Sequence, residues 1–168
     1  MICCVTGHRP QGFPFKRGFW GDMEFDIYIS DLYNITEKFI YEGYDHFITG
    51  MADGADLDFA QSILYHQASY EYIKLEAALP YPVTKTKNIT EYIEQRDYVL
   101  KKCNITTVVS PYYFKGCMQK RNRYMVDKSD LVLAIWNGKQ SGGTWDTIKY
   151  ARSKNKPIHY ILLNELHL

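Results

Sequence analysis

The chain has 168 residues, of which 46% are hydrophobic and 23% are charged, and its formal net charge at pH 7 is +1. This composition is that of a soluble globular protein, long enough to bury a core in one domain spanning residues 1–168. The near-neutral charge argues against an extended nucleic-acid-binding surface and against attraction to anionic lipid. We therefore expect neither nucleic acid nor a membrane as a partner.

Targeting and redox signals are weak. No stretch approaches 18 consecutive apolar residues, and the first residues lack the charged and apolar regions of a signal peptide. Cys3, Cys4, Cys103 and Cys117 form no CxxC pair and have no histidine at metal-ligand spacing. We expect a cytoplasmic protein with reduced, structural thiols, without a metal site or a cofactor.

Strand-like and helix-like patterns alternate along the chain. Short apolar runs predict strands at residues 2–5, 46–49, 72–79, 105–109, 131–136 and 158–162. The segments between them predict helices at about 21–41, 88–102, 117–128 and 142–153, and a further helix that follows residues 53–56 and carries Leu57, Ala60, Ile63 and Leu64. Apolar strands separated by helices indicate an α/β fold, with a mostly parallel sheet flanked by helices on both faces.

The first loop to inspect follows the first strand, because ligands bind beyond the carboxyl ends of parallel strands. It contains Thr6, Gly7, His8 and Arg9. The glycine would let the backbone approach a ligand, and the arginine offers a bidentate fork for phosphate or carboxylate. A turn glycine followed by a surface arginine explains the same residues, so this loop alone leaves both interpretations open.

The second loop runs from Gly50 to Asp56 and opens a helix. Small residues there, Gly54 among them, would leave helix N-terminal N–H groups free for an anion. The spacing is not GxGxxG, so the dinucleotide fingerprint is absent. Asp53 and Asp56 are each favoured as helix caps, with acceptance from ribose hydroxyls as the alternative.

The last loop is the most informative. Glycines and hydroxyls at a helix entrance predict a phosphate cradle formed by Ser141, Gly142, Gly143 and Thr144, although an ordinary Ser or Thr N-cap explains part of the pattern. Trp136 or Tyr112 would stack on a base. Upstream, Arg121 and Met125 are four residues apart and share a helix face, so Arg121 would point at the pocket, unless the basic run is only a solvated face.

Five blocks in series resemble a known family: CCVTGHRP, HFITGMADGADLDFA, LEAALPYP, GCMQKRNRYMVDKSDLVLAIWNG and SGGTWDTIKYA. They resemble the YpsA-like branch of the SLOG superfamily over nearly the whole chain. The resemblance implies a Rossmann-like three-layer α/β sandwich, related to the DNA-processing protein DprA and to the LOG phosphoribohydrolases, with a nucleotide-type ligand at the glycine loops. Relatives often pair through helices, which makes a homodimer an expectation by analogy. Kinship of fold does not supply a reaction.

The LOG enzymes cleave the N-glycosidic bond of cytokinin nucleotides, using an arginine ahead of a methionine and a glutamate in PGGxGTxxE. By this resemblance Arg121 matches the arginine, and Gly142 and Gly143 lie in the region of the glycine motif. The chain departs from the motif because the proline is missing and Thr147 stands where the glutamate would be, one residue from the shorter Asp146. These departures put LOG-type hydrolysis in doubt.

We therefore predict a nucleotide-binding module, a sensor or sequestering protein for a nucleotide-derived metabolite. Its predicted ligand residues are Thr6, Gly7, His8, Arg9, Gly50, Gly54, Asp56, Arg121, Trp136, Ser141, Gly142, Gly143 and Thr144. The alternative is an N-glycosidic hydrolase of nucleoside phosphates, with Asp146, Arg121 and His8 as catalytic candidates. DprA-like nucleic-acid binding through the basic run at 115–128 ranks third.

Overall fold

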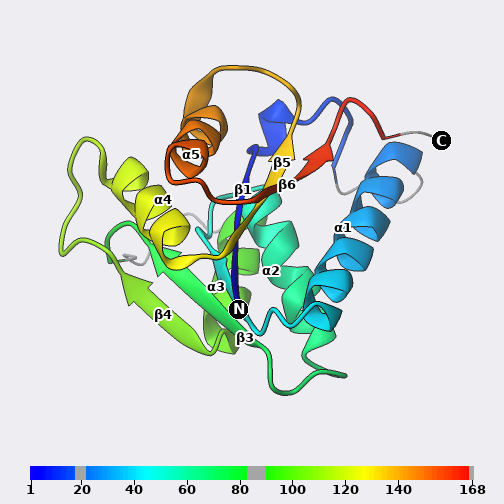
Figure 1. Ribbon diagram of the computed structural model, residues 1–168, viewed down its shortest axis with the longest axis horizontal. Coiled ribbons are helices and arrows are strands. Elements are labelled where there is room, and N and C mark those ends of the chain that lie inside the picture. Colours follow the sequence, from blue (N-terminus) through cyan, green and yellow to red (C-terminus); the bar gives the residue numbers. More distant parts are fainter. Residues whose placement is uncertain (18–21, 83–89, 167–168) are drawn as a thin grey trace.

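The computed structural model describes residues 1–17, 22–82 and 90–166, and these residues form one parallel sheet flanked by helices (Figure 1). The strands are β1 (Ile2–Gly7), β2 (His46–Thr49), β3 (Lys74–Leu79), β4 (Ile105–Val108), β5 (Leu131–Trp136) and β6 (Ile158–Leu162). Their order in the sheet is β4-β3-β2-β1-β5-β6, and every pairing is parallel. This confirms the predicted Rossmann-like α/β class.

The helices are α1 (Met23–Tyr41), α2 (Ala55–His66), α3 (Glu91–Lys102), α4 (Cys117–Lys128) and α5 (Gly142–Ser153). The predicted starts of the first and third helices, at 21 and 88, lie outside the described residues. A short 3-10 helix at Pro10–Gly12 was not predicted, and β3 begins two residues later than expected, because Tyr72 lies in a turn. Within the described segments, no helix has both the length and the apolar character needed to cross a bilayer.

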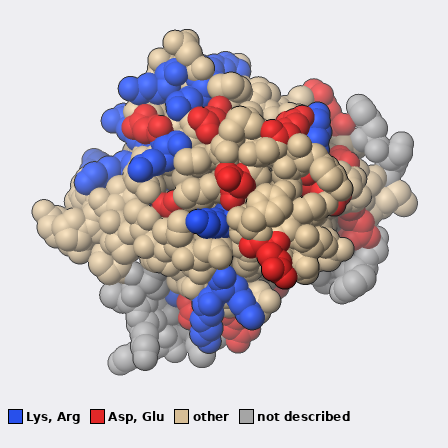
Figure 2. All heavy atoms as spheres, turned by 60° about the horizontal axis from the view of Figure 1, so that its bottom comes forward, with Lys and Arg blue, Asp and Glu red and all other residues tan. Residues whose placement is uncertain are grey.

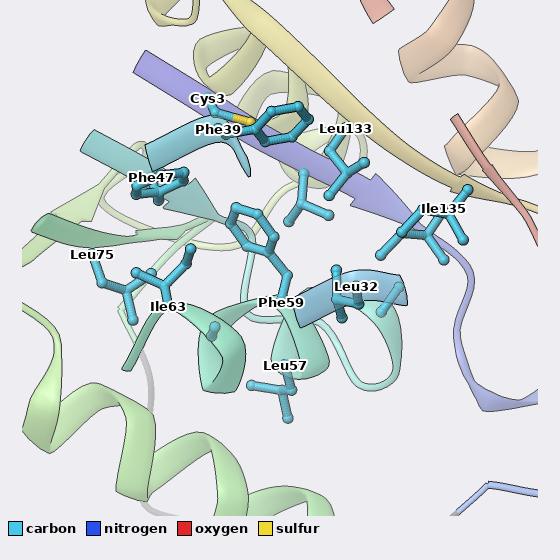
Figure 3. Close-up of a cluster of buried hydrophobic side chains, with 14 of the residues drawn as sticks. Cys3, Leu32, Phe39, Phe47, Leu57, Phe59, Ile63, Leu75, Leu133 and Ile135 are labelled. Carbon is cyan, nitrogen blue, oxygen red and sulfur yellow. The ribbon is translucent and has the colours of Figure 1, made fainter. Parts of the chain in front are cut away.

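Side chains from the strands pack into two hydrophobic cores, one on each face of the sheet. Helices α1, α2 and α3 cover one face, where Phe47, Leu75 and Leu133 pack with Phe59 and Ile63 (Figure 3). Helices α4 and α5 cover the other face and form a smaller cluster. Because the strands bury both faces, their sequences are apolar without alternation, which is the pattern that predicted them.

The two adjacent cysteines show this division within one strand. Cys3 belongs to the larger core and Cys4 to the smaller one, and both are free thiols. Burial raises the pKa of both thiols, so they remain protonated at neutral pH. They act as small apolar side chains, as the sequence predicted.

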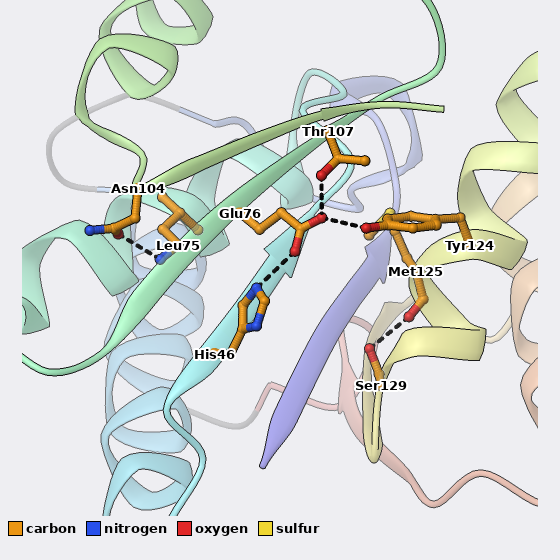
Figure 4. A network of polar contacts seen from close by, with 8 residues as sticks. All are labelled: His46, Leu75, Glu76, Asn104, Thr107, Tyr124, Met125 and Ser129. Carbon is orange, nitrogen blue, oxygen red and sulfur yellow. Dashed lines mark hydrogen bonds and ion pairs between the residues drawn. The ribbon is translucent and has the colours of Figure 1, made fainter. Parts of the chain in front are cut away.

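Two helices are too few for one face of a six-stranded sheet. A helix about 10 Å across covers about two strands spaced about 4.8 Å apart. The edge strand β4 is accordingly open on this face, and Ile105, the β4 partner of Glu76 in the sheet, is 36% exposed. Beside it, β3 carries a buried carboxylate, Glu76, which is hydrogen-bonded to His46, Thr107 and Tyr124 (Figure 4). These polar side chains thus cover the part of the sheet face that lies beyond α4.

The chain order of the strands places the site. From β1 the chain adds β2, β3 and β4 on one side, and then returns to the other side of β1 with β5. The loops that leave the carboxyl ends of β1 and β5 therefore diverge. In open parallel sheets, this switch point is where ligands bind.

Candidate functional site

A cleft of about 460 Å³ lies at the switch point, between the loops that follow β1 and β5. It brings together residues from four separate parts of the chain that the sequence had marked. These are Thr6, Gly7, His8, Arg9, Asp56, Arg121, Ser141, Gly143 and Thr144. The parallel topology accounts for this gathering, because it brings the carboxyl ends of the strands to one edge.

The loop that follows β1 and includes residues 8–12 is called the β1 loop. Hydrogen bonds hold this loop and the end of β1 to the other walls of the cleft. The hydroxyl of Thr144 donates to the carbonyl oxygen of Gly7 at 2.9 Å, which fixes the first turn of α5. The side-chain amide of Asn137 donates to the carbonyl oxygen of Gly12 at 2.8 Å. The N–H group of Ala55, at the start of α2, donates to the carbonyl oxygen of His8 at 3.1 Å. These bonds make the cleft a preformed feature of the fold.

Two of the predicted glycines are required by contacts within the protein. A Cβ on Gly7 would lie 2.3 Å from the Cβ of Ala55, and a Cβ on Gly54 would lie 2.5 Å from the carbonyl oxygen of His8. Gly54 also has a φ of 93°, which side chains disfavour. Both glycines let the β1 loop lie directly on the start of α2.

A buried arginine and a buried carboxylate form the floor of the cleft. Arg121 is 6% exposed, and its Nη1 donates to the carbonyl oxygen of Gly50. Asp56 is also 6% exposed and accepts from the N–H of Ala52 at 3.2 Å. Burial raises the pKa of the Asp56 carboxyl, and the positive charge of Arg121 opposes that rise. Met125, which shares a face of α4 with Arg121, is buried as well.

Arg121 is connected to α5 by a chain of side-chain contacts. Its Nε donates to the Oδ1 of Asn122 at 2.8 Å, and the Nδ2 of Asn122 donates to the hydroxyl of Thr147 at 2.9 Å. Thr147 in turn donates to the carbonyl oxygen of Gly143 at 2.8 Å. The position where the LOG motif has a glutamate thus serves to orient Arg121 and the first turn of α5.

The N-terminus of α5 opens into the cleft without a side-chain cap. Ser141 is the N-cap residue, but its hydroxyl makes no capping bond. Within the described part of the chain, no atom lies within 4 Å of the positions that a Cβ on Gly142 or Gly143 would occupy. Free N–H groups and the positive end of the helix dipole therefore face the cleft, and this combination binds anions. Lys139 adds a positive charge on the same side.

His8 is a neutral side chain at the cleft. Burial lowers the pKa of its imidazole below 6.5, the neighbouring Asn137 side chain partly opposes that decrease, and the charge of Lys139 adds to it. Its Nε2 is buried and has no hydrogen-bond partner among the described residues. At neutral pH the Nε2 of the ring can form one hydrogen bond with a ligand, as donor or acceptor depending on the tautomer, but the ring carries no charge.

Several predicted residues lie elsewhere. Trp136 stacks on Trp145, with ring centroids 5.5 Å apart and an angle of 8° between the planes, so it does not line the cleft as a base platform. Asp146 lines a separate hollow between α4 and α5 and pairs with Lys149 at 2.9 Å. Tyr112 is 69% exposed on the loop before α4.

The glycine loops also differ in detail from the prediction. The favoured capping roles of Asp53 and Asp56 were wrong, because the N-cap of α2 is Gly54. Gly50 lines a smaller hollow beside the cleft, and Gly142 lines neither space. The tight packing of the β1 loop on α2 leaves the N-cap position to a residue without a side chain.

The sequence prediction missed polar residues and the hollow beside the cleft. Asn122, Asn137 and Lys139 line the cleft. The adjoining hollow of about 180 Å³ shares Arg9, Ala52, Met118 and Arg121 with the cleft. It is otherwise lined mainly by apolar and aromatic side chains, including Leu79, Tyr81 and Tyr92. Asn137 and Lys139 flank Gly138 directly after β5, and their place at the carboxyl end of a strand could have marked them as cleft residues. Nothing in the sequence around Tyr92 marks it.

The sequence profile of the YspA SLOG family matches residues 3–166. The chain belongs to this family. It is also similar to a UPF0398 protein of Bacillus pumilus, with 24% identity over 170 residues that cover 98% of this chain and 89% of the relative. The family match therefore covers all the cleft walls and all of the sheet except Ile2, and it agrees with the resemblance that the sequence blocks indicated.

Proposed function

We propose that this SLOG-family chain binds a nucleotide or a nucleotide-derived metabolite in the cleft, as a sensor or sequestering module. One observation carries the proposal: the uncapped N-terminus of α5 faces a cleft whose described lining includes the cations Arg9, Arg121 and Lys139 and one carboxylate, Asp56. Such an excess of positive charge and free N–H groups favours a phosphate-bearing ligand.

In the proposed complex, phosphate oxygens accept from the N–H groups of Gly143 and Thr144, and Arg9 and Lys139 neutralise their charge. The ligand then extends past Arg9 into the adjoining hollow, where Tyr81 and Tyr92 offer aromatic walls for a base. Arg121 lines both spaces. This placement replaces Trp136 and Tyr112 as the predicted base platforms.

The hydrolase alternative has less support. Asp146 lies outside the cleft and is ion-paired, and Thr147 is engaged with Asn122 and Gly143. Asp56, the carboxylate in the cleft, accepts a backbone hydrogen bond beside the charge of Arg121. We therefore propose binding and assign no catalytic role.

Replacing Arg9 with glutamine should weaken nucleotide binding about tenfold or more, because a charge-assisted hydrogen bond to phosphate contributes about 1.5–3 kcal/mol. Titration calorimetry with AMP, ADP, NAD⁺ and ADP-ribose measures the effect, with inorganic phosphate as a competitor. Lys74→Gln removes an equal charge from an exposed site outside the cleft and should leave the affinity unchanged. Asp146→Asn should also bind normally. The proposal fails if no nucleotide binds, or if Arg9→Gln binds as tightly as the parent.

A further inference from the structure

The small net charge of the chain conceals a strong separation of charge along the sequence. Residues 115–156 contain ten lysines and arginines and three aspartates, a net charge of +7, whereas the rest of the chain carries −6. Figure 2 shows lysine and arginine side chains gathered at the upper left of one face of the molecule, with few acidic side chains among them. The overall charge therefore does not describe this surface.

The positive charge lies mainly on α4, α5 and the ends of these helices. We call this surface the basic face and define it by seven exposed side chains: Lys115, Lys120, Arg123, Lys128, Lys149, Arg152 and Lys154. None of them lines the nucleotide cleft, whose cations are Arg9, Arg121 and Lys139. The basic face is thus a second electropositive surface beside the cleft.

Most of the contacts of the basic face are with aromatic rings. Arg123 and Lys154 both lie against the ring of Tyr150, at 5.3 and 5.4 Å from its centroid. Arg152 lies 5.3 Å from the ring centroid of Trp145. Among the described residues, Lys149 is the member of the basic face that forms an ion pair, with Asp146. A cation–π contact orients a cation without cancelling its charge, so the face keeps its positive potential.

The basic face is also hollowed. One hollow of about 410 Å³ lies between α4 and α5, and a second, of about 500 Å³, lies between α4 and the open edge of β4. Arg123 lines both hollows. The first hollow also contains Lys149 and Asp146, and the second contains Lys120 and Asp127. At one end of α4, Tyr112 and Tyr113 are 69% and 67% exposed.

We propose that the basic face binds single-stranded nucleic acid. Phosphates follow the cations along the hollows beside α4, and a base stacks on Tyr112, because stacking on exposed aromatics together with a cationic track is how single strands are bound without sequence readout. A flat bilayer does not enter hollows on both sides of a helix. An acidic protein segment would use the cations but would leave the exposed tyrosines without a role. Double-stranded nucleic acid would also leave the exposed tyrosines without a role, because its bases are already stacked on one another.

The test is fluorescence anisotropy with a labelled single-stranded DNA oligonucleotide of mixed sequence, from about 50 to about 200 mM salt. The triple variant Lys120→Gln, Arg123→Gln, Lys128→Gln should lower the slope of log affinity against log salt by about 2, since each phosphate contact contributes about 0.7. The matched control removes three exposed lysines away from the face, Lys74→Gln, Lys101→Gln, Lys102→Gln, and should bind as the parent does.

A second variant separates stacking from charge. Tyr112→Ala should weaken binding of the same oligonucleotide about tenfold while leaving the salt slope unchanged. The proposal is overturned if the parent chain does not bind the oligonucleotide, or if both triple variants bind equally. It is also overturned if Tyr112→Ala binds as tightly as the parent, or if the chain binds anionic phospholipid vesicles in place of the oligonucleotide. None of these outcomes depends on Arg9 or on the nucleotide cleft.

Discussion

Replacing Gly54 with alanine should destabilise the protein by about 3 kcal/mol and should displace the β1 loop. Alanine pays about 1–2 kcal/mol to adopt the positive φ of 93°. Its Cβ would also lie 2.5 Å from the carbonyl oxygen of His8, a backbone atom that cannot rotate away, and such overpacking costs about 1–3 kcal/mol. Urea denaturation followed by circular dichroism measures the change.

Gly143→Ala is the matched control for this prediction. No atom of the described residues lies within 4 Å of its added Cβ, and Gly143 is the second residue of α5, without a positive φ, so the stability of the variant should stay within about 1 kcal/mol of the parent. If Gly54→Ala were as stable as Gly143→Ala, the close packing of the β1 loop on α2 would be refuted.

The elements that the sequence predicted best have strong local signals at both ends. The helix at Cys117–Lys128, the strand at Leu131–Trp136 and the helix at Gly142–Ser153 were all predicted with the bounds that the structure has. The gathering of the β1, α2 and α5 loops was also predictable, because it follows from parallel strands. Element boundaries and loop neighbours are properties of local sequence and of topology.

Side-chain roles were harder to predict because they depend on contacts between distant residues. Gly7 lines the cleft, but the contact that excludes a side chain there is with Ala55, 48 residues away in the sequence. Trp136 looked like a base platform, but its ring is occupied by Trp145. The net charge of +1 excluded a basic surface only under the assumption that charge is evenly spread, and the sheet order brings α4 and α5 together on one face. The net charge and the spacing of residues along the sequence do not show which side chains come together in the fold.

Glu76 provides the second large effect, and it was not predicted at all. The carboxyl is 4% exposed within β3, and it accepts hydrogen bonds from Thr107 at 2.8 Å and Tyr124 at 2.7 Å, while the Nε2 of His46 lies 2.8 Å from its other oxygen (Figure 4). Burial by itself raises the pKa of this carboxyl. The three hydrogen bonds outweigh burial and lower the pKa from 4.5 to about 2.

Glu76→Gln should therefore lower the free energy of unfolding at pH 7 by about 2–3 kcal/mol. The amide of glutamine carries no negative charge, and its NH₂ group cannot accept the hydrogen bonds that a carboxylate oxygen accepts. The matched control is Glu42→Gln, an exposed carboxylate paired with Lys38 at 3.8 Å, which should cost less than about 1 kcal/mol. Chemical denaturation of the three proteins at pH 7 gives both values. Equal stability of the two variants would contradict a structural role for the network.

The same network has a defined pH dependence. Since the folded pKa of Glu76 lies below the unfolded value, its ionised form stabilises the fold above about pH 4.5, and this contribution is lost as the pH falls from about 4.5 towards about 2. The parent chain should lose up to about 3 kcal/mol more than Glu76→Gln over this interval, because a difference of one pKa unit corresponds to about 1.4 kcal/mol. Acid titrations of the two proteins with urea should therefore converge at low pH. Parallel curves would show that Glu76 titrates with the same pKa in the folded and unfolded states, and that the hydrogen bonds from His46, Thr107 and Tyr124 do not hold its charge.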